Sequence, residues 1–166
     1  MDSFQKDMLD LLPRLRRMAR VLTRDPADAD DLTQLTVERA LARRDQWREG
    51  TRQDSWMFRI MRNAWIDESR TRNRRGRVLA PPEAGVHAAD PTAPSLDGRL
   101  ALTAVEAALE ALPEDQRIAV ALVLIEGLSY QEAADSLDVP MGTLTSRLAR
   151  GRMALQAALI DQGTRP

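Results

Sequence analysis

The sequence predicts an all-α protein of two small helical domains, joined by a flexible linker rich in proline and alanine. Outside the linker, apolar residues recur at helical spacing, and no run alternates apolar and polar residues as a strand does. Residues 78–97 contain four prolines and no apolar periodicity, so they cannot bury enough surface to offset the entropy of ordering. The predicted organisation is therefore a domain over 1–77, a linker over 78–97 and a domain over 98–166, each domain being near the lower size limit for a self-sufficient core.

Two helices are predicted at the start of the N-terminal domain. Pro13 lies where a new helix can begin, because the missing N–H of proline is harmless in a first turn. Asp25 followed by Pro26 is a second start signal, a capping acid with proline at the first helical position, and this helix runs to about Arg44. An apolar face starts before Pro13 with Phe4, Met8, Leu11 and Leu12. The residues that supply the buried sides of the two helices are Leu15, Met18, Ala19, Leu22, Leu32, Leu35, Thr36, Ala40 and Leu41.

A polar loop over residues 45–54 separates these helices from a third. Asp54 or Ser55 is predicted to cap this third helix, whose apolar face includes Ile60 and Ala64. The other faces of the helix are basic and polar. The third helix therefore has one side for the core and one side for a partner.

The charge is nearly balanced over the chain and uneven along it. The chain has 24 basic and 25 acidic residues, yet seven arginines and only two acids lie from Arg59 to Arg77. A basic block in a neutral protein is the electrostatic footprint of a polyanion such as nucleic acid. A solvated helix end has the same composition, so charge alone leaves both interpretations open.

Four helices are predicted after the linker. The first ends before Pro113, and the second covers Glu114–Glu126 with Gly127 as its C-terminal cap. Ser129 and Glu132 form a capping box that starts a short third helix. That helix covers about 130–137, residues 138–140 break it, and the last helix covers about 141–160.

Residues 129–152 have the form of a helix-turn-helix, in which the second helix can lie in the major groove of DNA. Serine, threonine and arginine can bond bases and phosphates. A helical hairpin in an ordinary bundle gives a similar two-helix pattern. The candidate DNA-reading residues of the second helix are Thr143, Thr145, Ser146, Arg147 and Arg150.

Composition excludes several other chemistries. The chain has no cysteine and a single histidine, which excludes disulfides, thiol nucleophiles and metal centres rich in cysteine or histidine. No stretch approaches the ~18 consecutive apolar residues of a membrane span, and the first residues lack the basic and apolar regions of a signal peptide. We expect a soluble, cytoplasmic protein.

Three segments together resemble the extracytoplasmic-function (ECF) sigma factors of bacterial RNA polymerase. DPADADDLTQLTVERAL resembles the polymerase-binding helix of this family. SWMFRIMRNAWIDESRTRNRR resembles the helix that reads the promoter −10 element. ALPEDQRIAVALVLIEGLSYQEAADSLDVPMGTLTSRLARGRMAL resembles the domain that binds the −35 element. The order and spacing of the three segments, with a proline-rich linker between them, make the resemblance specific.

The resemblance implies that the loop 45–54 forms a pocket for a base extruded from the −10 element. Flipped bases are held by pockets and by stacking on aromatic or arginine side chains. Core packing is the alternative role for the two tryptophans, and Asn63 can pair with a base edge or with Asp67. The candidate −10 residues are Trp47, Arg48, Trp56, Arg59, Arg62, Asn63 and Arg70.

The acidic start of the second helix has three interpretations. Its carboxylates complement the helix dipole, they could form a carboxylate metal site, or, as the resemblance implies, the helix docks on the clamp helices of the polymerase largest subunit. The candidate polymerase-binding residues are Asp28, Asp31, Leu32 and Gln34. The family pattern is not matched throughout, because Pro140 stands where many relatives have a capping serine and Thr145 where many have lysine.

The function that follows from the resemblance is promoter recognition and strand opening for core RNA polymerase, without catalytic residues, metal or cofactor. The implied partners are core polymerase, promoter DNA and an anti-sigma factor. A relaxed linker of this length spans ~25 Å, so the free protein is expected to be compact or variable and extended only on polymerase. Three other functions stay open: a stand-alone helix-turn-helix regulator, an enzyme that uses the acidic cluster with a metal, and a structural interaction module.

Overall fold

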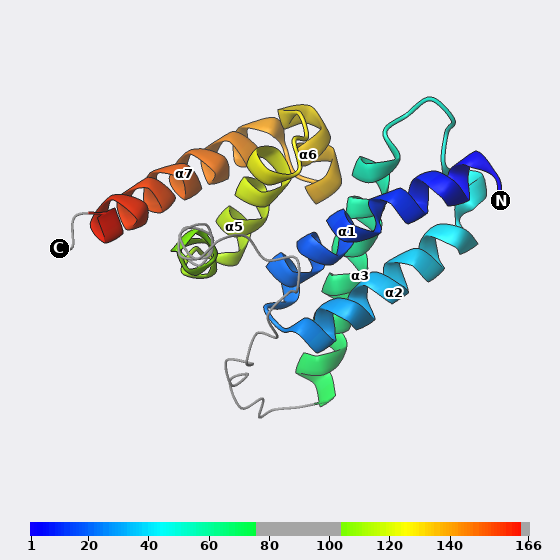
Figure 1. The fold of residues 1–166 in the computed structure, drawn as a ribbon, viewed down its shortest axis with the longest axis horizontal. Coiled ribbons are helices and arrows are strands. Elements are labelled where there is room, and N and C mark those ends of the chain that lie inside the picture. Colours follow the sequence, from blue (N-terminus) through cyan, green and yellow to red (C-terminus); the bar gives the residue numbers. More distant parts are fainter. Residues whose placement is uncertain (76–103, 164–166) are drawn as a thin grey trace.

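The computed structural model describes residues 1–75 and 104–163, and every element in these two ranges is helical (Figure 1). The prediction of an all-α protein with two helical domains is confirmed. The predicted linker, residues 78–97, and the start of the helix before Pro113 lie outside the described residues.

The N-terminal domain is a bundle of three mutually packed helices, α1 (Ser3–Thr23), α2 (Pro26–Ala42) and α3 (Gln53–Arg75). The structure corrects the prediction that a new helix begins at Pro13, because α1 continues through this residue. An internal proline removes one backbone hydrogen bond. Met8 and Leu15, on either side of Pro13, are both buried in the core, and this packing holds the two halves of α1 in line.

The start of α2 follows the prediction and the start of α3 differs from it. The Asp25 side chain accepts a hydrogen bond from the Asp28 amide at 2.9 Å, with Pro26 in the first turn. In contrast, α3 begins at Gln53, before the two residues expected to cap it. The Asp54 carboxylate accepts from the Ser55 amide at 2.8 Å, and it also forms ion pairs with two arginines, which fix its position inside the first turn.

The C-terminal domain contains a short helix over 104–110, α5 (Glu114–Val120), α6 (Tyr130–Leu137) and α7 (Met141–Gly163). The single α-helix predicted over Glu114–Glu126 is wrong in its last third, where η2 (Ala121–Ile125) is a π-helical turn. The Glu126 amide donates to the Ala121 carbonyl at 2.9 Å, five residues back. Gly127 follows with a φ of 72°, and it ends the helix as predicted.

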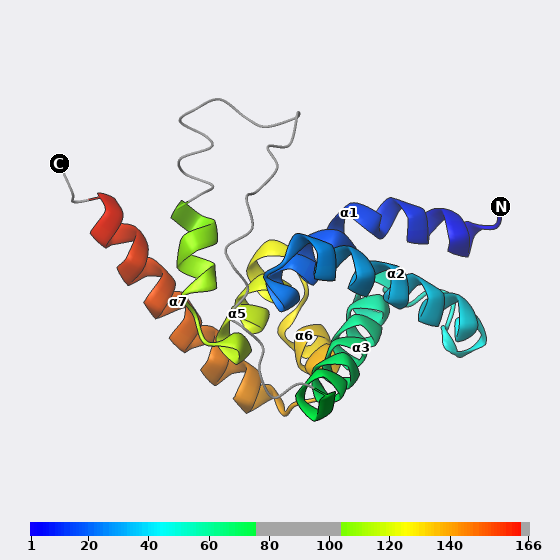
Figure 2. The ribbon, with the colours of Figure 1, turned by 90° about the horizontal axis from the view of Figure 1, so that it is seen from below.

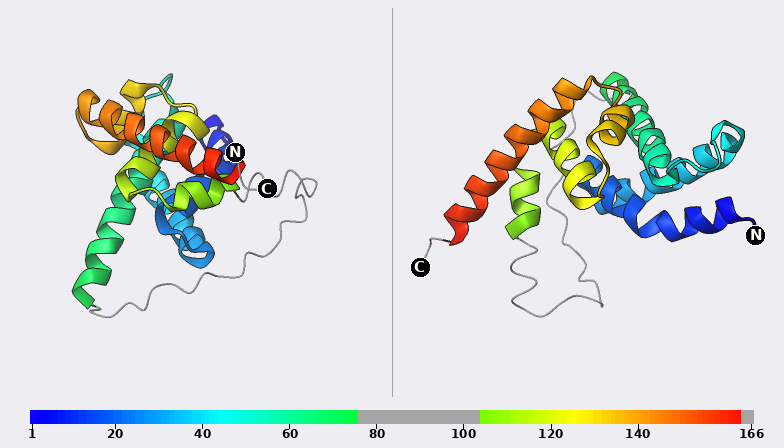
Figure 3. Two further views of the ribbon diagram at one scale, coloured as in Figure 1. Left: turned by 90° about the vertical axis from the view of Figure 1, so that its left-hand side faces the viewer. Right: turned by 90° about the horizontal axis from the view of Figure 1, so that it is seen from above.

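The two domains pack against each other. Helix α3 lies against α6, and α1 contacts α5 and η2. Figures 2 and 3 show α7 beginning beside α3 and running away from the N-terminal bundle. The buried apolar residues of the bundle continue without a break into those of α5 and α6, including Ile118, Ala133 and Leu137. The candidate residues of both domains therefore lie on helices that pack against this shared core.

Candidate nucleic-acid interface

Helices α6 and α7 form the predicted helix-turn-helix. The capping box at the start of α6 is present in both directions: the Ser129 hydroxyl accepts from the Glu132 amide at 3.1 Å, and the Glu132 carboxylate accepts from the Ser129 amide at 2.9 Å. Asp138 ends α6 in the left-handed conformation with a φ of 55°. Ala133 and Ala134 are buried, and such small side chains allow α6 to approach its neighbours closely.

The predicted −35 residues lie along α7, whose buried side carries Leu144 and Leu148. Ser146 and Arg150 are exposed. The remaining candidates have contacts of their own. The exposed Thr145 hydroxyl donates to the Met141 carbonyl at 2.9 Å, Thr143 is half-buried, and the half-buried Arg147 lies 3.6 Å from the Asp115 carboxylate.

The two tryptophans near the loop 45–54 pack on one phenylalanine of α1. The ring centroids of Trp47 and Trp56 lie 5.3 and 6.0 Å from that of Phe4. Both indoles are therefore partly core residues, the alternative role considered for them. The Trp47 Nε1 atom is buried and finds no hydrogen-bond partner among the described residues, and Gln53 Oε1 is in the same situation.

The remaining −10 candidates lie along α3 and at the loop, where Arg48, Arg59 and Arg70 are exposed. Asn63 is half-buried, and its Oδ1 atom lies 3.4 Å from Arg62 Nη1. Asp67, the alternative partner considered for Asn63, accepts instead from Arg39 of α2 at 3.1 Å.

Arg62 and Arg147, candidates for two different promoter elements, line one cavity between the domains. The cavity has a volume of about 200 Å³, and its other walls include Trp65, Glu114 and Leu137. Burial lowers the pKa of Arg62, and the nearby positive charges of Arg147 and Arg59 act in the same direction, against the attraction of Asp138. In this arrangement Arg62 of α3 and Arg147 of α7 face the same cavity.

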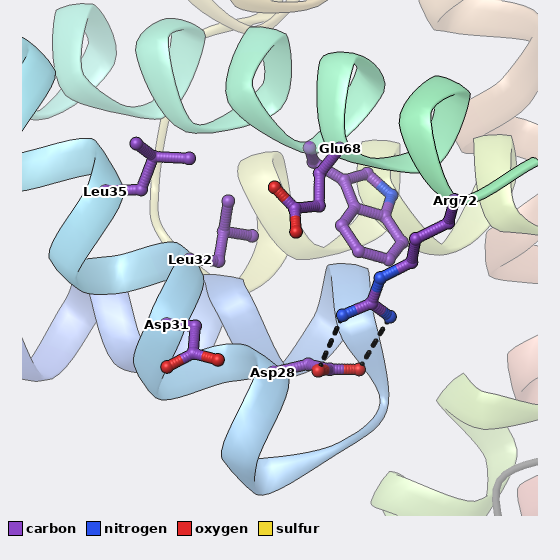
Figure 4. A pocket seen from close by; sticks show the side chains of 7 residues that line it. Asp28, Asp31, Leu32, Leu35, Glu68 and Arg72 are labelled. Carbon is purple, nitrogen blue, oxygen red and sulfur yellow. Dashed lines mark hydrogen bonds and ion pairs between the residues drawn. The ribbon is translucent and has the colours of Figure 1, made fainter. Parts of the chain in front are cut away.

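Figure 4 shows the acidic start of α2 beside the basic end of α3. Asp31 and Gln34 are exposed, as a docking surface requires. Leu32 is only 4 % exposed and packs in the core, so it supports α2 from inside. Asp28 is paired with Arg72 at 2.8 Å, and the hydrogen bonds from Arg72 lower the pKa of this carboxyl group.

The carboxylates at the start of α2 do not converge on a metal site. Within the described parts of the chain, no three or more metal-ligating side chains come together. The helices of residues 1–75 and 104–163 also include none that is long and apolar enough to cross a bilayer.

Sequence reasoning missed a set of ionic contacts between the domains. Glu126 receives hydrogen bonds from Arg14 and Arg17 of α1, and Arg52 donates to Glu132 of α6. In the sequence, these contacts correspond only to Arg14 and Arg17, which are three residues apart, and to Glu126, a single acidic residue after an apolar run. Neither feature predicts which residue forms the ion pair, because the two residues of each pair lie at least 80 positions apart in the chain.

Comparison with known families matches both halves of the chain. Residues 102–155 match the model for "Sigma-70, region 4", and residues 8–62 match the model for "Sigma2 domain of PhyR".

Two curated relatives are similar to nearly the whole chain. The ECF RNA polymerase sigma factor EcfG of Rhodopseudomonas palustris is 35 % identical over 98 % of this chain and 88 % of its own length. The ECF RNA polymerase sigma factor SigE of Mycolicibacterium smegmatis is 39 % identical over 86 % of this chain, which spans 56 % of that relative.

A solved structure has the same fold. The sigma factor RpoE of Bartonella quintana, in complex with the anti-sigma factor NepR, superposes with a TM-score of 0.81 at 31 % identity. The match covers 96 % of this chain and 98 % of the other.

A helix-turn-helix domain packed on a three-helix bundle with a basic, aromatic third helix defines a DNA-binding transcription factor of the sigma-70 class. Within that class, the chain belongs to the ECF sigma factor family.

Proposed function

We propose that this chain binds bacterial core RNA polymerase in the cytoplasm and directs it to specific promoters, with no catalytic step of its own. One observation carries the proposal: a helix-turn-helix and a basic helix beside two tryptophans occur in one chain. A duplex reader needs only the first of these. The second suits capture of unpaired bases, which is needed when a promoter opens.

The proposed division of labour follows the exposed groups. Helix α7 presents Ser146 and Arg150 for duplex DNA at the −35 element. The loop 45–54 and α3, with Arg59, receive the melted −10 element. The exposed residues at the start of α2, Asp31 and Gln34, contact core polymerase, and the membership of this chain in the ECF family supports that assignment.

An anti-sigma factor is the second proposed protein partner. The similar sigma factor RpoE of Bartonella quintana was solved in complex with the anti-sigma factor NepR. The overlap with that structure covers 96 % of this chain, so both domains have a counterpart in the protein of that complex.

The test is transcription in vitro with purified chain, core polymerase and fragmented DNA from the source genome. We expect discrete transcripts that require the chain and that fall about fivefold or more with Arg59→Ala or Arg150→Ala, because a contact of arginine with a base contributes ~1–3 kcal/mol. Gln156→Ala, on the exposed outer part of α7, is the matched control and leaves the transcripts unchanged.

A stand-alone regulator gives a different result. It would bind duplex DNA tightly without polymerase, and core polymerase would gain no promoter from it. That outcome would contradict the proposed function.

A further inference from the structure

The ionic contacts between the domains have a consistent direction. In these contacts the N-terminal domain supplies the arginines, and the C-terminal domain supplies the carboxylates. Arg14 and Arg17 meet Glu126, and Arg52 meets Glu132, with nitrogen–oxygen distances of 2.8 to 3.0 Å. The sequence has the same asymmetry, because residues 1–77 carry 18 basic and 13 acidic residues whereas residues 98–166 carry 6 and 9.

Glu126 is enclosed by the two arginines of α1. Its side chain is 1 % exposed. It accepts from Arg14 Nε at 2.8 Å and from Arg17 Nε and Nη2 at 2.8 and 3.0 Å. Arg14 Nη2 also donates to the Glu126 main-chain carbonyl at 2.9 Å. Two guanidinium groups that converge on one oxyanion form a geometry that suits a phosphate as well as a carboxylate.

This cluster adjoins the segment proposed to hold the melted −10 element. Arg52 belongs to the loop 45–54 itself, and the Arg14 guanidinium lies over the ring of Phe58 on α3, 5.5 Å from its centroid. Helix α6 covers the same place, where the Ser136 and Ser55 hydroxyl oxygens lie 3.1 Å apart.

The charge of the cluster is balanced only while the domains are packed together. Asp54, in the N-terminal domain, pairs with Arg14 and Arg52 and offsets one of the three positive charges of Arg14, Arg17 and Arg52. The other two are offset by the C-terminal glutamates. Without the C-terminal domain, the N-terminal surface would therefore carry an excess of positive charge.

We propose that Arg14, Arg17 and Arg52 form a binding surface for the backbone phosphates of single-stranded DNA, which Glu126 and Glu132 occupy while the domains are packed together. The inference rests on the proposed function, since it needs a melted strand at the loop 45–54. The two acids imitate phosphates, so the C-terminal domain competes with DNA for the N-terminal domain. Separation of the domains then exposes a basic surface that the free chain neutralises internally.

The test separates the two sides of the contact. Glu126→Gln and Glu132→Gln weaken the competitor, and Gln at position 132 can still complete the capping box of α6. The double variant Arg14→Gln/Arg17→Gln also weakens the domain contact, but it removes two of the three arginines of the surface. Because the natural chain has no cysteine, Arg43→Cys and Gln156→Cys at two exposed positions allow dye labelling for energy transfer between the domains.

We expect lower energy transfer in the acid variants and in the arginine variant alike, because each loses charge-assisted hydrogen bonds across the interface. Affinity for a fluorescent oligo-thymidine 20-mer separates the two kinds of variant. The affinity should rise about tenfold for Glu126→Gln, in line with the loss of charged hydrogen bonds to the competing carboxylate. For Arg14→Gln/Arg17→Gln, the affinity should be equal to that of the unaltered chain or lower. The logarithmic salt dependence of binding is also shallower in the arginine variant than in Glu126→Gln, by about 1.4, because two phosphates are no longer neutralised.

Arg16→Gln, an exposed arginine on the same helix, is the control for simple loss of charge. Equal oligonucleotide affinities for the acid variants and the arginine variant would overturn the inference, as would unchanged affinity in Glu132→Gln when its energy transfer has fallen. Thermal unfolding of each variant verifies that it is folded. Transcription with the unaltered chain is measured in parallel: transcripts without the affinity difference overturn this surface alone, whereas absence of transcripts overturns the proposed function.

Discussion

Arg72, at the basic end of α3, donates two parallel hydrogen bonds to the two carboxylate oxygens of Asp28, at 2.8 and 2.9 Å. The pair connects the end of the proposed −10 helix to the start of the helix proposed to bind polymerase (Figure 4). Two features that sequence patterns assign to different partners therefore neutralise each other in the free chain. Two of the polymerase-binding candidates are acidic, Asp28 and Asp31. Of these two, only Asp31 is exposed.

The Asp28–Arg72 pair predicts a pH-dependent contribution to stability. The hydrogen bonds from Arg72 place the pKa of Asp28 below its ordinary value of 3.8, with burial acting in the opposite direction. A carboxyl group whose pKa is lowered by folding stabilises the fold above its unfolded pKa and loses that effect as pH falls through the folded value.

We expect Asp28→Asn to lower the free energy of unfolding by about 0.5–1 kcal/mol at pH 7, the range for a partly exposed ion pair. The difference from the natural chain should shrink once the pH falls below 3.8. Urea unfolding across pH measures it, with exposed Asp30→Asn as the control on the same helix. A difference that is independent of pH would show that Asp28 does not act through its charge.

The close approach of α5 and α7 predicts that a side chain at Gly151 destabilises the fold. A Cβ atom at this position would lie 2.7 Å from Val120 Cγ2 and 3.3 Å from the Gln116 carbonyl oxygen. Overpacking destabilises a fold by about 1–3 kcal/mol. The higher helix propensity of alanine relative to glycine offsets up to ~1 kcal/mol of this loss. Gly151→Ala should therefore lower stability by about 0.5–2 kcal/mol in thermal or urea unfolding.

The matched control for Gly151 lies in the same helix. A Cβ atom at Gly142 meets nothing within 4 Å, so Gly142→Ala should be neutral or stabilising. Val120→Ala should reduce the penalty of Gly151→Ala in the double variant, because it removes the closest atom. Additive effects of the two substitutions would contradict the proposed clash.

Thr145 and Arg150 of α7 should contribute unequally to −35 binding. The Thr145 hydroxyl already donates to the Met141 carbonyl of its own helix, whereas Arg150 is exposed. In the complex with core polymerase, Arg150→Gln should weaken binding to a promoter fragment about tenfold. Thr145→Val should change the affinity for the same fragment by no more than about threefold, because valine keeps the shape of the side chain. Gel-shift titration measures both, and a larger loss for Thr145→Val than for Arg150→Gln would be contrary to this ranking.

The elements predicted well are those with local signals. Asp25 caps α2, and the capping box of Ser129 and Glu132 starts α6, because each cap is satisfied by atoms three residues away. The turn after α6 is also local, since Asp138 closes it with hydrogen bonds back into the same helix. A single sequence contains the information for features of this kind.

The features that sequence reasoning missed depend on tertiary contacts. Whether Pro13 starts a helix or lies inside one is decided by buried residues on both sides that pack on other helices. The π-helical turn places Glu126 between two arginines of α1, about 110 residues away in the chain. No local pattern encodes such a partner.

The candidate site was predicted as three separate surfaces, and the structure partly joins them. Arg62 and Arg147, candidates for two different promoter elements, line one cavity because the two domains pack together. Domain packing is set by the sum of many long-range contacts. The sequence therefore indicates what each helix can bind and leaves open which groups are covered in the free chain.

Permanganate footprinting of promoter DNA tests the central claim most directly, because it detects unpaired thymines at the −10 element. The account predicts reactive thymines only when this chain and core polymerase are both present, and their loss when Arg59→Ala and Arg62→Ala are combined. Protection of duplex DNA by the chain alone, with no reactive thymines after core polymerase is added, would contradict it.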